Sequence, residues 1–212
     1  MNYAQLSQQI QDYCETTEQS FVANIPNFVQ LAEERIYNSV QIPAIRKNVT
    51  GTTTINFQYL ALPSDWLSTF SMAVIDPVTG EYEYLLNKDV NYIRQAYPPP
   101  NSYGKPAYYA IWDDTSMILG PTPDAAYTME LHYYYYPPSI VNTSTSWLGT
   151  NFETVLLYGS LREAYTYLKG EQDMMAYYEQ KYQEALGLLK RLGDGLDRQD
   201  AYRSGQARVP VP

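Results

Sequence analysis

The sequence predicts an α+β protein in which a bundle of about four helices carries an inserted, mainly antiparallel β domain and an extended C-terminal tail. Three observations lead to this fold class. Apolar residues recur at helical spacing near both ends of the chain, the middle is rich in Val, Ile, Thr and Tyr with frequent turn residues, and no apolar periodicity follows Gly193. We therefore expect N-terminal helices over 1–43, a β-rich insertion over 44–138, a helical hairpin over 139–193 and a tail over 194–212.

The two N-terminal helices are predicted from apolar residues three and four positions apart. In the first helix these residues are Tyr3, Leu6, Ile10 and Tyr13. The second helix is expected to begin after Asn24, with Pro26 in its first turn, where a missing N–H is tolerated. Its apolar stripe consists of Val29, Ala32, Ile36 and Val40. Glu33 and Glu34 are expected to face water, and Pro43 prevents the helix from continuing.

The middle region is predicted to consist of strands joined by turns. Asp76–Gly80 has Asp, Pro and Gly where a type I turn and its exit favour them. Asp113-Asp114 is expected to join one strand around 108–112 to another around 116–119. The run Tyr127–Tyr136 alternates, with large amphipathic rings on both faces. This pattern favours a strand that has a neighbour on each side.

The C-terminal helical hairpin has its own start and stop signals. Thr150–Glu153 has the spacing of a capping box, and the helix after it carries an apolar arc wide enough to imply contacts on two sides. Lys169 is expected in its last turn, with Gly170 as the left-handed stop. Gly193–Gly195 is interpreted as the C-cap of the second helix. The apolar stripe of that second helix is Met175, Tyr178, Tyr182, Ala185, Leu189 and Leu192.

The composition excludes many classes of enzyme and binding protein. Among 212 residues there are 1 Cys and 1 His, so the chain cannot hold a disulfide framework, a Cys-rich metal site or a multi-histidine site. With 14 Lys+Arg against 23 Asp+Glu, the net charge of -9 argues against a protein that grips nucleic-acid phosphates. Neither a signal peptide nor a spanning segment is recognisable, so we expect a soluble chain with no membrane partner.

The remaining candidates for chemistry have simpler structural interpretations. Glu33-Glu34 are adjacent on a helix and do not share a face, and Asp113-Asp114 suits a turn. His132 lies within the alternating Tyr strand, where a structural role is favoured over that of a base. We therefore expect no catalytic residues, no metal and no cofactor, although a small carboxylate-dependent hydrolase using His132 and Asp113 remains an alternative.

The 23 Tyr residues are the main positive signal, since there are only 5 Phe. Tyr combines a large apolar ring with a hydrogen-bonding tip, which suits surfaces that are both buried and wet. We favour intermolecular interfaces over an ordinary core that uses Tyr in place of Phe. An aromatic platform for sugars or single-stranded nucleic acid is another possibility, but the basic residues that the nucleic acid would need are missing.

Five segments, in this order and spacing, resemble one protein family. The chain is similar to the head-to-tail adaptor (connector) proteins of tailed double-stranded-DNA bacteriophages, and the likeness covers nearly its whole length. The segments that carry it are Ile25–Ile36, Leu62–Leu67, Pro106–Tyr108, Leu119–Pro123 with the Tyr strand that ends at Pro137, and Trp147-Leu148 before the helical hairpin.

The resemblance implies a structural role without catalysis. Proteins of this family form a ring of roughly a dozen copies (a dodecamer) beneath the portal protein, which continues the DNA channel toward the tail. The chain would be made in the host cytoplasm and reside in the virion at the neck between head and tail. Its partners would be the portal protein, tail, nozzle or fibre proteins, and neighbouring copies, while double-stranded DNA would pass through the channel without specific binding.

The resemblance also suggests which residues make these contacts. The family's C-terminus grips the portal, which here points to Arg198, Tyr202, Arg203, Arg208, Val209 and Val211. Apart from the resemblance, which gives no role to individual residues of the Tyr run 133–136, we expect tail-facing or inter-subunit loops at Pro99, Tyr103, Tyr134 and Tyr136. The alternative function is a tail or fibre-attachment protein whose β domain binds another tail component or a glycan.

Overall fold

The computed structural model describes residues 1–76, 78–99 and 101–198, with the backbone alone for 194–198. The chain divides into two compact units. The β unit is the continuous segment Arg46–Tyr135, and the helical unit combines Met1–Ile45 with the chain from Tyr136 onward. Helices together with mainly antiparallel sheets confirm the predicted α+β class.

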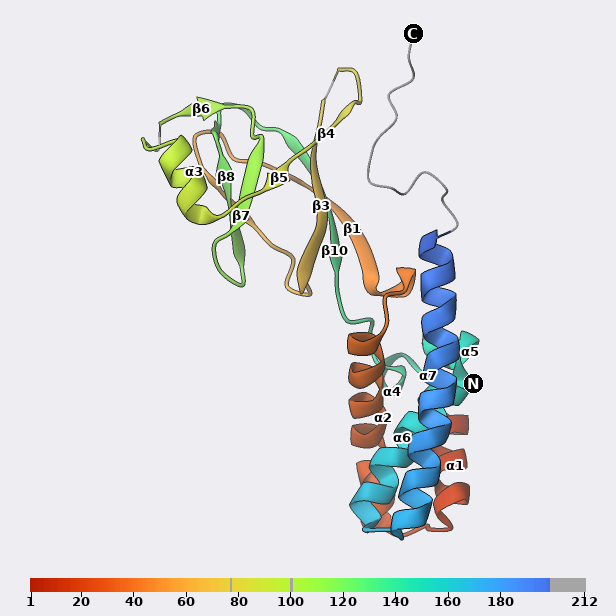
Figure 1. Cartoon of the computed structure of the whole chain (residues 1–212). Coiled ribbons are helices and arrows are strands. Elements are labelled where there is room, and N and C mark those ends of the chain that lie inside the picture. The colour runs from red at the N-terminus through yellow and green to blue at the C-terminus, as the bar shows by residue number, and fades with distance from the viewer. Residues whose placement is uncertain (77, 100, 199–212) are drawn as a thin grey trace. The chain divides into compact units, whose positions relative to one another are not determined.

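The helical unit is organised around α6, which contacts α1, α2, α5 and α7. The wide apolar arc of α6 is therefore covered by helices of the same chain, and Leu156, Leu161 and Ala164 are fully buried. In Figure 1 the unit consists of α1 (Tyr3–Cys14), α2 (Gln19–Ser39), the 3-10 turn η1 (Pro43–Ile45), α4 (Ile140–Thr143), α5 (Trp147–Asn151), α6 (Glu153–Leu168) and α7 (Gln172–Arg198).

The start of α2 differs from the prediction. The helix begins at Gln19, and Pro26 lies inside it. Phe21 and Ile25 are fully buried, so the apolar stripe extends about two turns further toward the N-terminus than was expected. Burial of these large side chains outweighs the hydrogen bond that Pro26 cannot donate.

The predicted capping box at Thr150–Glu153 is wrong. Residues Trp147–Asn151 form a separate short helix capped by Ser146, and α6 begins at Glu153 without a side-chain cap. The Trp147 and Phe152 rings stack at 5.6 Å across the junction, which stabilises the break between the two helices. The left-handed stop of α6 is also one residue earlier than predicted, at Lys169.

Helix α7 continues past both predicted cap glycines to Arg198, so residues 194–198 of the predicted tail are helical. A Cβ atom on Gly193 would lie 2.6 Å from the carbonyl oxygen of Gln41, which is closer than real Cβ contacts allow. Gly193 therefore permits the close approach of α7 to the segment after α2, instead of ending the helix.

The β unit contains two four-stranded sheets and a small two-stranded one. Their strand orders are β1-β10-β3-β4, β2-β8-β7-β5 and β6-β9. Helix α3 (Val90–Ala96) packs through Ile93 on the second sheet. The strands are β1 (Arg46–Thr52), β2 (Tyr59–Ala61), β3 (Ser68–Ile75), β4 (Tyr82–Tyr84), β5 (Leu86–Asn87), β6 (Tyr103–Gly104), β7 (Tyr108–Ile111), β8 (Ser116–Gly120), β9 (Thr122–Pro123) and β10 (Thr128–Tyr134).

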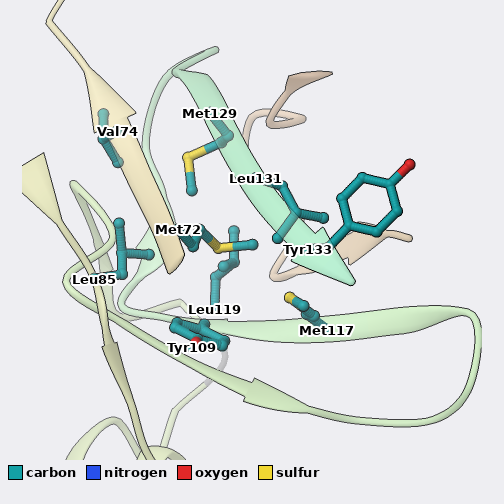
Figure 2. Packing of buried hydrophobic residues seen from close by; sticks show 9 residues of the cluster. All are labelled: Met72, Val74, Leu85, Tyr109, Met117, Leu119, Met129, Leu131 and Tyr133. Atoms are coloured by element: carbon teal, nitrogen blue, oxygen red, sulfur yellow. The ribbon is translucent and has the colours of Figure 1, made fainter. Parts of the chain in front are cut away.

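The core of the β unit lies between the two larger sheets. Figure 2 shows Met72, Met129 and Leu131 of the first sheet pointing toward Tyr109, Met117 and Leu119 of the second. Leu85 joins the same cluster from the single residue between β4 and β5, where the chain passes from one sheet to the other. The β unit is therefore a small sandwich whose core is rich in Met and Tyr.

The predicted turns and the central strand of the β unit are confirmed. The Asp76 side chain accepts hydrogen bonds from the N–H groups of Val78 and Thr79, and Gly80 has a φ of 72°. Asp113 similarly accepts from Thr115 in the β7–β8 hairpin. Strand β10 pairs with β1 on one side and β3 on the other, as its alternating pattern predicted.

Candidate interaction surfaces

The residues predicted to dock on a portal lie almost entirely beyond the part of the chain that the structure describes. Arg198 is the last residue of α7, and its side chain is not among those described. Tyr202, Arg203, Arg208, Val209 and Val211 are outside the described residues.

The four predicted loop residues occupy different settings, three in the β unit and one in the helical unit. Pro99 lies in a loop and Tyr103 is 52% exposed in β6. Tyr134 belongs to β10, where its ring packs edge-on against Phe70. Tyr136 belongs to the helical unit, where its hydroxyl donates to the Asn38 side chain at 2.7 Å.

The tyrosines divide between core and surface. Among the described residues five are buried, namely Tyr37, Tyr109, Tyr133, Tyr178 and Tyr182. Eight are exposed, namely Tyr13, Tyr82, Tyr84, Tyr92, Tyr103, Tyr136, Tyr167 and Tyr177. The Tyr excess therefore serves both as core packing and as exposed aromatic surface.

An aromatic hollow of about 440 Å³ lies on the β unit beside β2 and the β7–β8 hairpin. The rings of Phe57 and Tyr59 are 5.6 Å apart, and those of Tyr59 and Trp112 are 5.5 Å apart, both edge to face. The guanidinium of Arg94 lies 4.7 Å from the Trp112 ring centroid. The hollow is lined by Phe57, Tyr59, Ala61, Trp112, Asp113, Thr115 and Ser116.

Sequence reasoning missed this aromatic hollow, because its residues come from separate segments that no motif links. It combines exposed ring surface with a carboxylate, hydroxyls and a neighbouring cation. Such a surface can bind a partner through ring stacking supplemented by hydrogen bonds at its rim.

The first sheet carries a second group of aromatic residues on the face away from the core. The Arg46 guanidinium lies 4.7 Å from the Phe70 ring and 5.7 Å from the Tyr134 ring. His132 is next to Phe70 on the same face, with ring centroids 5.8 Å apart. His132 therefore lies in an aromatic environment on the sheet surface.

Glu33 is buried, with 3% of its surface exposed, which contradicts the expectation that it faces water. Its carboxylate accepts the backbone N–H of Ile140 at 3.0 Å and so joins α2 to the start of α4. Burial raises the pKa of Glu33, against the opposing effects of hydrogen bonds from Ile140 and Ser139. The signal was present in the sequence, since Glu33 lies four residues after Val29 and next to Ala32 on the apolar stripe.

A smaller hollow of about 200 Å³ borders Glu33 on the surface of the helical unit. Its wall also includes the exposed Glu34, so its rim is acidic. The residues that line this acidic hollow are Gln30, Glu33, Glu34, Tyr37, Tyr136, Pro137 and Ser139.

The other candidates for chemistry have local structural roles. Hydrogen bonds from the Thr115 hydroxyl and then the Thr115 N–H lower the pKa of Asp113, which is engaged in its own turn. Burial raises the pKa of the Cys14 thiol to about 11, so this cysteine stays protonated near neutral pH. Within 1–76, 78–99 and 101–198, no three His, Cys, Asp or Glu side chains gather as a metal site would require.

A family model described as SU10 adaptor protein matches residues 1–210, which is nearly the whole chain. No curated protein matches the chain. None of the helices in the described part of the chain has the length and apolar content needed to cross a membrane.

Proposed function

Because the chain belongs to the SU10 adaptor protein family and is therefore a phage adaptor protein, we propose that it is the head-to-tail adaptor of a tailed bacteriophage. In this proposal, roughly a dozen copies form a ring under the portal protein, extend the DNA channel and anchor the tail. The protein has a structural role in the virion and is not an enzyme. The observation that carries the proposal is the family match over residues 1–210.

The charge of the chain supports a channel through which DNA slides. The β unit contains nine acidic and five basic residues, a net charge of -4 out of the total of -9. Both units therefore carry a net negative charge, and neither one neutralises the charge of the other. A ring of such subunits repels the DNA phosphates and lets the duplex pass without specific binding.

We assign portal binding to the C-terminal segment, with Arg198, Tyr202, Arg203, Arg208, Val209 and Val211 as its contacts. The assignment is tested by removing residues 199–212, because α7 continues to Arg198 and a cut after Gly193 would shorten that helix. The truncated chain should keep its circular dichroism spectrum and lose binding to the purified portal protein. A full-length variant with residues 199–212 in shuffled order is the matched control for length and charge, and it should also lose binding.

Negative-stain imaging and native mass spectrometry of the full chain, with and without portal protein, test the ring itself. Rings on the portal are the expected result. A folded truncated chain that still binds the portal would overturn the assignment of the tail, and a full chain that never forms rings would overturn the adaptor ring.

The aromatic hollow favours a second candidate function. In this alternative, the protein is a tail or fibre-attachment protein whose β unit binds another tail component or a glycan through Phe57, Tyr59 and Trp112. Trp112→Ala should then abolish binding of tail proteins or of glycans on an array. Tyr84→Ala removes an exposed ring of the β unit outside the hollow and is the matched control. Unchanged binding by Trp112→Ala would exclude the hollow as the contact.

A further inference from the structure

The exposed face of α2 forms a stripe with one carboxylate, that of Glu34, next to the acidic hollow. The α2 stripe consists of Asn27, Leu31, Glu34 and Asn38, which are exposed and lie three or four residues apart on one side of the helix. Leu31 is 49% exposed, although it is a large apolar side chain. Glu34 makes no ion pair within the described part of the chain and forms part of the rim of the 200 Å³ hollow.

The end of α7 carries a mainly apolar patch with one positive charge, that of Arg191. The α7 patch consists of Gly187, Leu188, Arg191 and Leu192, and Leu188 is 60% exposed. The other arginines of the helical unit with described side chains are both engaged, Arg35 with Glu163 at 2.7 Å and Arg162 with Glu179 at 2.6 Å. Arg191 has no such partner among the described side chains, and it lies beside two exposed leucines.

The contacts within a single chain give no packing reason for a glycine at position 187 of α7. A glycine inside a helix costs about 1 kcal/mol relative to alanine. Gly193 and Gly159 have packing reasons, because a Cβ atom there would lie 2.6 Å from Gln41 and 3.2 Å from Ala32, respectively. At Gly187, apart from its chain neighbours and the nearby backbone of α7 itself, no atom of the described residues lies within 4 Å of the missing Cβ. A glycine on an open helix face allows a second helix to approach closely.

The α2 stripe and the α7 patch lie at a similar level of the helical unit, so that the patch of one copy can face the stripe of another copy. Both α2 and α7 pack on α6, and each keeps an exposed face. The contact between Gly193 and Gln41 puts the C-terminal part of α7 level with the end of α2. At 1.5 Å per residue, Glu34 and Arg191 lie within about two helical turns of that level. Contacts between different surfaces of identical subunits are the kind that close a ring.

We infer that the α7 patch of one copy docks on the α2 stripe of the next copy, with Arg191 facing Glu34 and Leu188 and Leu192 covering Leu31. This inference rests on the proposed ring and names the surfaces that close it. Gly187 allows α7 to approach α2 of the neighbour, and the acidic hollow receives the guanidinium. Opposite charges set the register of the two helices, while the leucines lose their contact with water.

Charge reversal tests this contact. Glu34→Arg and Arg191→Glu should each lower the fraction of subunits in portal-bound rings by about tenfold or more, because like charges then face each other. A mixture of the two variants in equal amounts should restore rings in which they alternate, since every contact again joins opposite charges. The double variant should also form rings. Both single variants should melt like the wild type, because the two side chains are exposed.

Gly187→Gln provides an independent test with opposite effects on two measurements. It should raise the melting temperature of the isolated chain, because glutamine is the better helix former, and reduce ring formation by obstructing the neighbour. If the wild type forms rings and the single charge reversals form them equally well, the contact is refuted and the adaptor proposal stands. Recovery of dimers but not rings from the mixture would also refute it. A wild type that forms no ring with portal protein instead refutes the proposed function.

Discussion

The two units of this protein bury their cores by different means. The β unit is one continuous segment, and its turns are fixed by side chains such as Asp76 and Asp113 that bond to neighbours two or three residues away. The helical unit joins the two ends of the chain, and its anchor from Glu33 to Ile140 spans 107 residues. The β unit is thus closed within one continuous segment, whereas the helical unit needs both ends of the chain, which makes them respond differently to truncation and mutation.

The largest expected effect comes from separating the units. The isolated segment 46–135 should fold, because its first and last strands pair directly, with Arg46 opposite Tyr134, and its core is self-contained. The segment 1–45 alone should be largely unfolded, since α1 and α2 bury their apolar faces against α6. Circular dichroism and NMR dispersion of the two fragments measure this. An unfolded 46–135 fragment would show that the β unit depends on the helices.

A cavity at the centre of the helical unit should cause the next largest loss of stability. Leu161→Ala removes a side chain with 0% exposure from α6 and should lower the free energy of unfolding by about 3 kcal/mol. Hydrogen exchange should accelerate in the helices and stay unchanged in the β unit. Leu119→Ala, in the β-unit core, is the matched variant and should show the reverse. Acceleration of both units by either variant would mean that they unfold together.

Replacing Glu33 should have a smaller effect that depends on pH. Glu33→Ala leaves the buried N–H of Ile140 without an acceptor and should cost about 2 kcal/mol, while Glu33→Gln keeps an acceptor and should cost less. Burial raises the pKa of Glu33 above 4.5. The stabilisation of the fold by the protonated Glu33 side chain is therefore present below pH 4.5 and is lost as the pH rises through the raised pKa. The stability of the wild type relative to Glu33→Gln should therefore fall as the pH rises. Denaturation of both proteins across this pH range measures it, and a flat difference would contradict the assignment.

The hydrogen bond between Tyr133 and Asp65 in the β unit should contribute least to stability. The Tyr133 hydroxyl donates to Asp65 at 2.8 Å, and Lys47 pairs with the same carboxylate at 2.7 Å. Tyr133→Phe should cost about 1 kcal/mol, against no change for the exposed Tyr103→Phe. Lys47, followed by Tyr133, lowers the pKa of Asp65, so this stabilisation is present above pH 3.8 and is lost as the pH falls through the lowered pKa. Urea titrations at neutral and acid pH should show the difference between variant and wild type shrinking in acid.

The difference between the two units also explains which features could be predicted from the sequence. The fold class and the turns at Asp76 and Asp113 follow from local spacing and turn residues, because these features depend on neighbours in the chain. The burial of Glu33 and the continuation of α7 through Gly193 depend on partners more than a hundred residues away. A local signal for a cap at Gly193 was thus overridden by packing against Gln41.

The aromatic hollow shows the same limit for a candidate site. Phe57, Tyr59 and Trp112 meet only because β2 pairs with β8 and β8 pairs with β7. The tyrosine count correctly indicated aromatic surface, but it could not separate Tyr133 in the core from Tyr103 at the surface. That distinction requires the strand pairing, which composition does not contain.

Because the helical unit joins the two ends of the chain, it can complete its folding only late in synthesis. A ribosome that adds about 5 to 20 residues per second takes about 5 to 20 s to make the segment between α2 and α4, and α1 and α2 wait for their partner helices throughout. The β unit can fold during this delay, whereas α7 is made last. The surfaces through which we propose that copies join therefore mature only when translation is nearly complete, and unfinished chains cannot enter the ring.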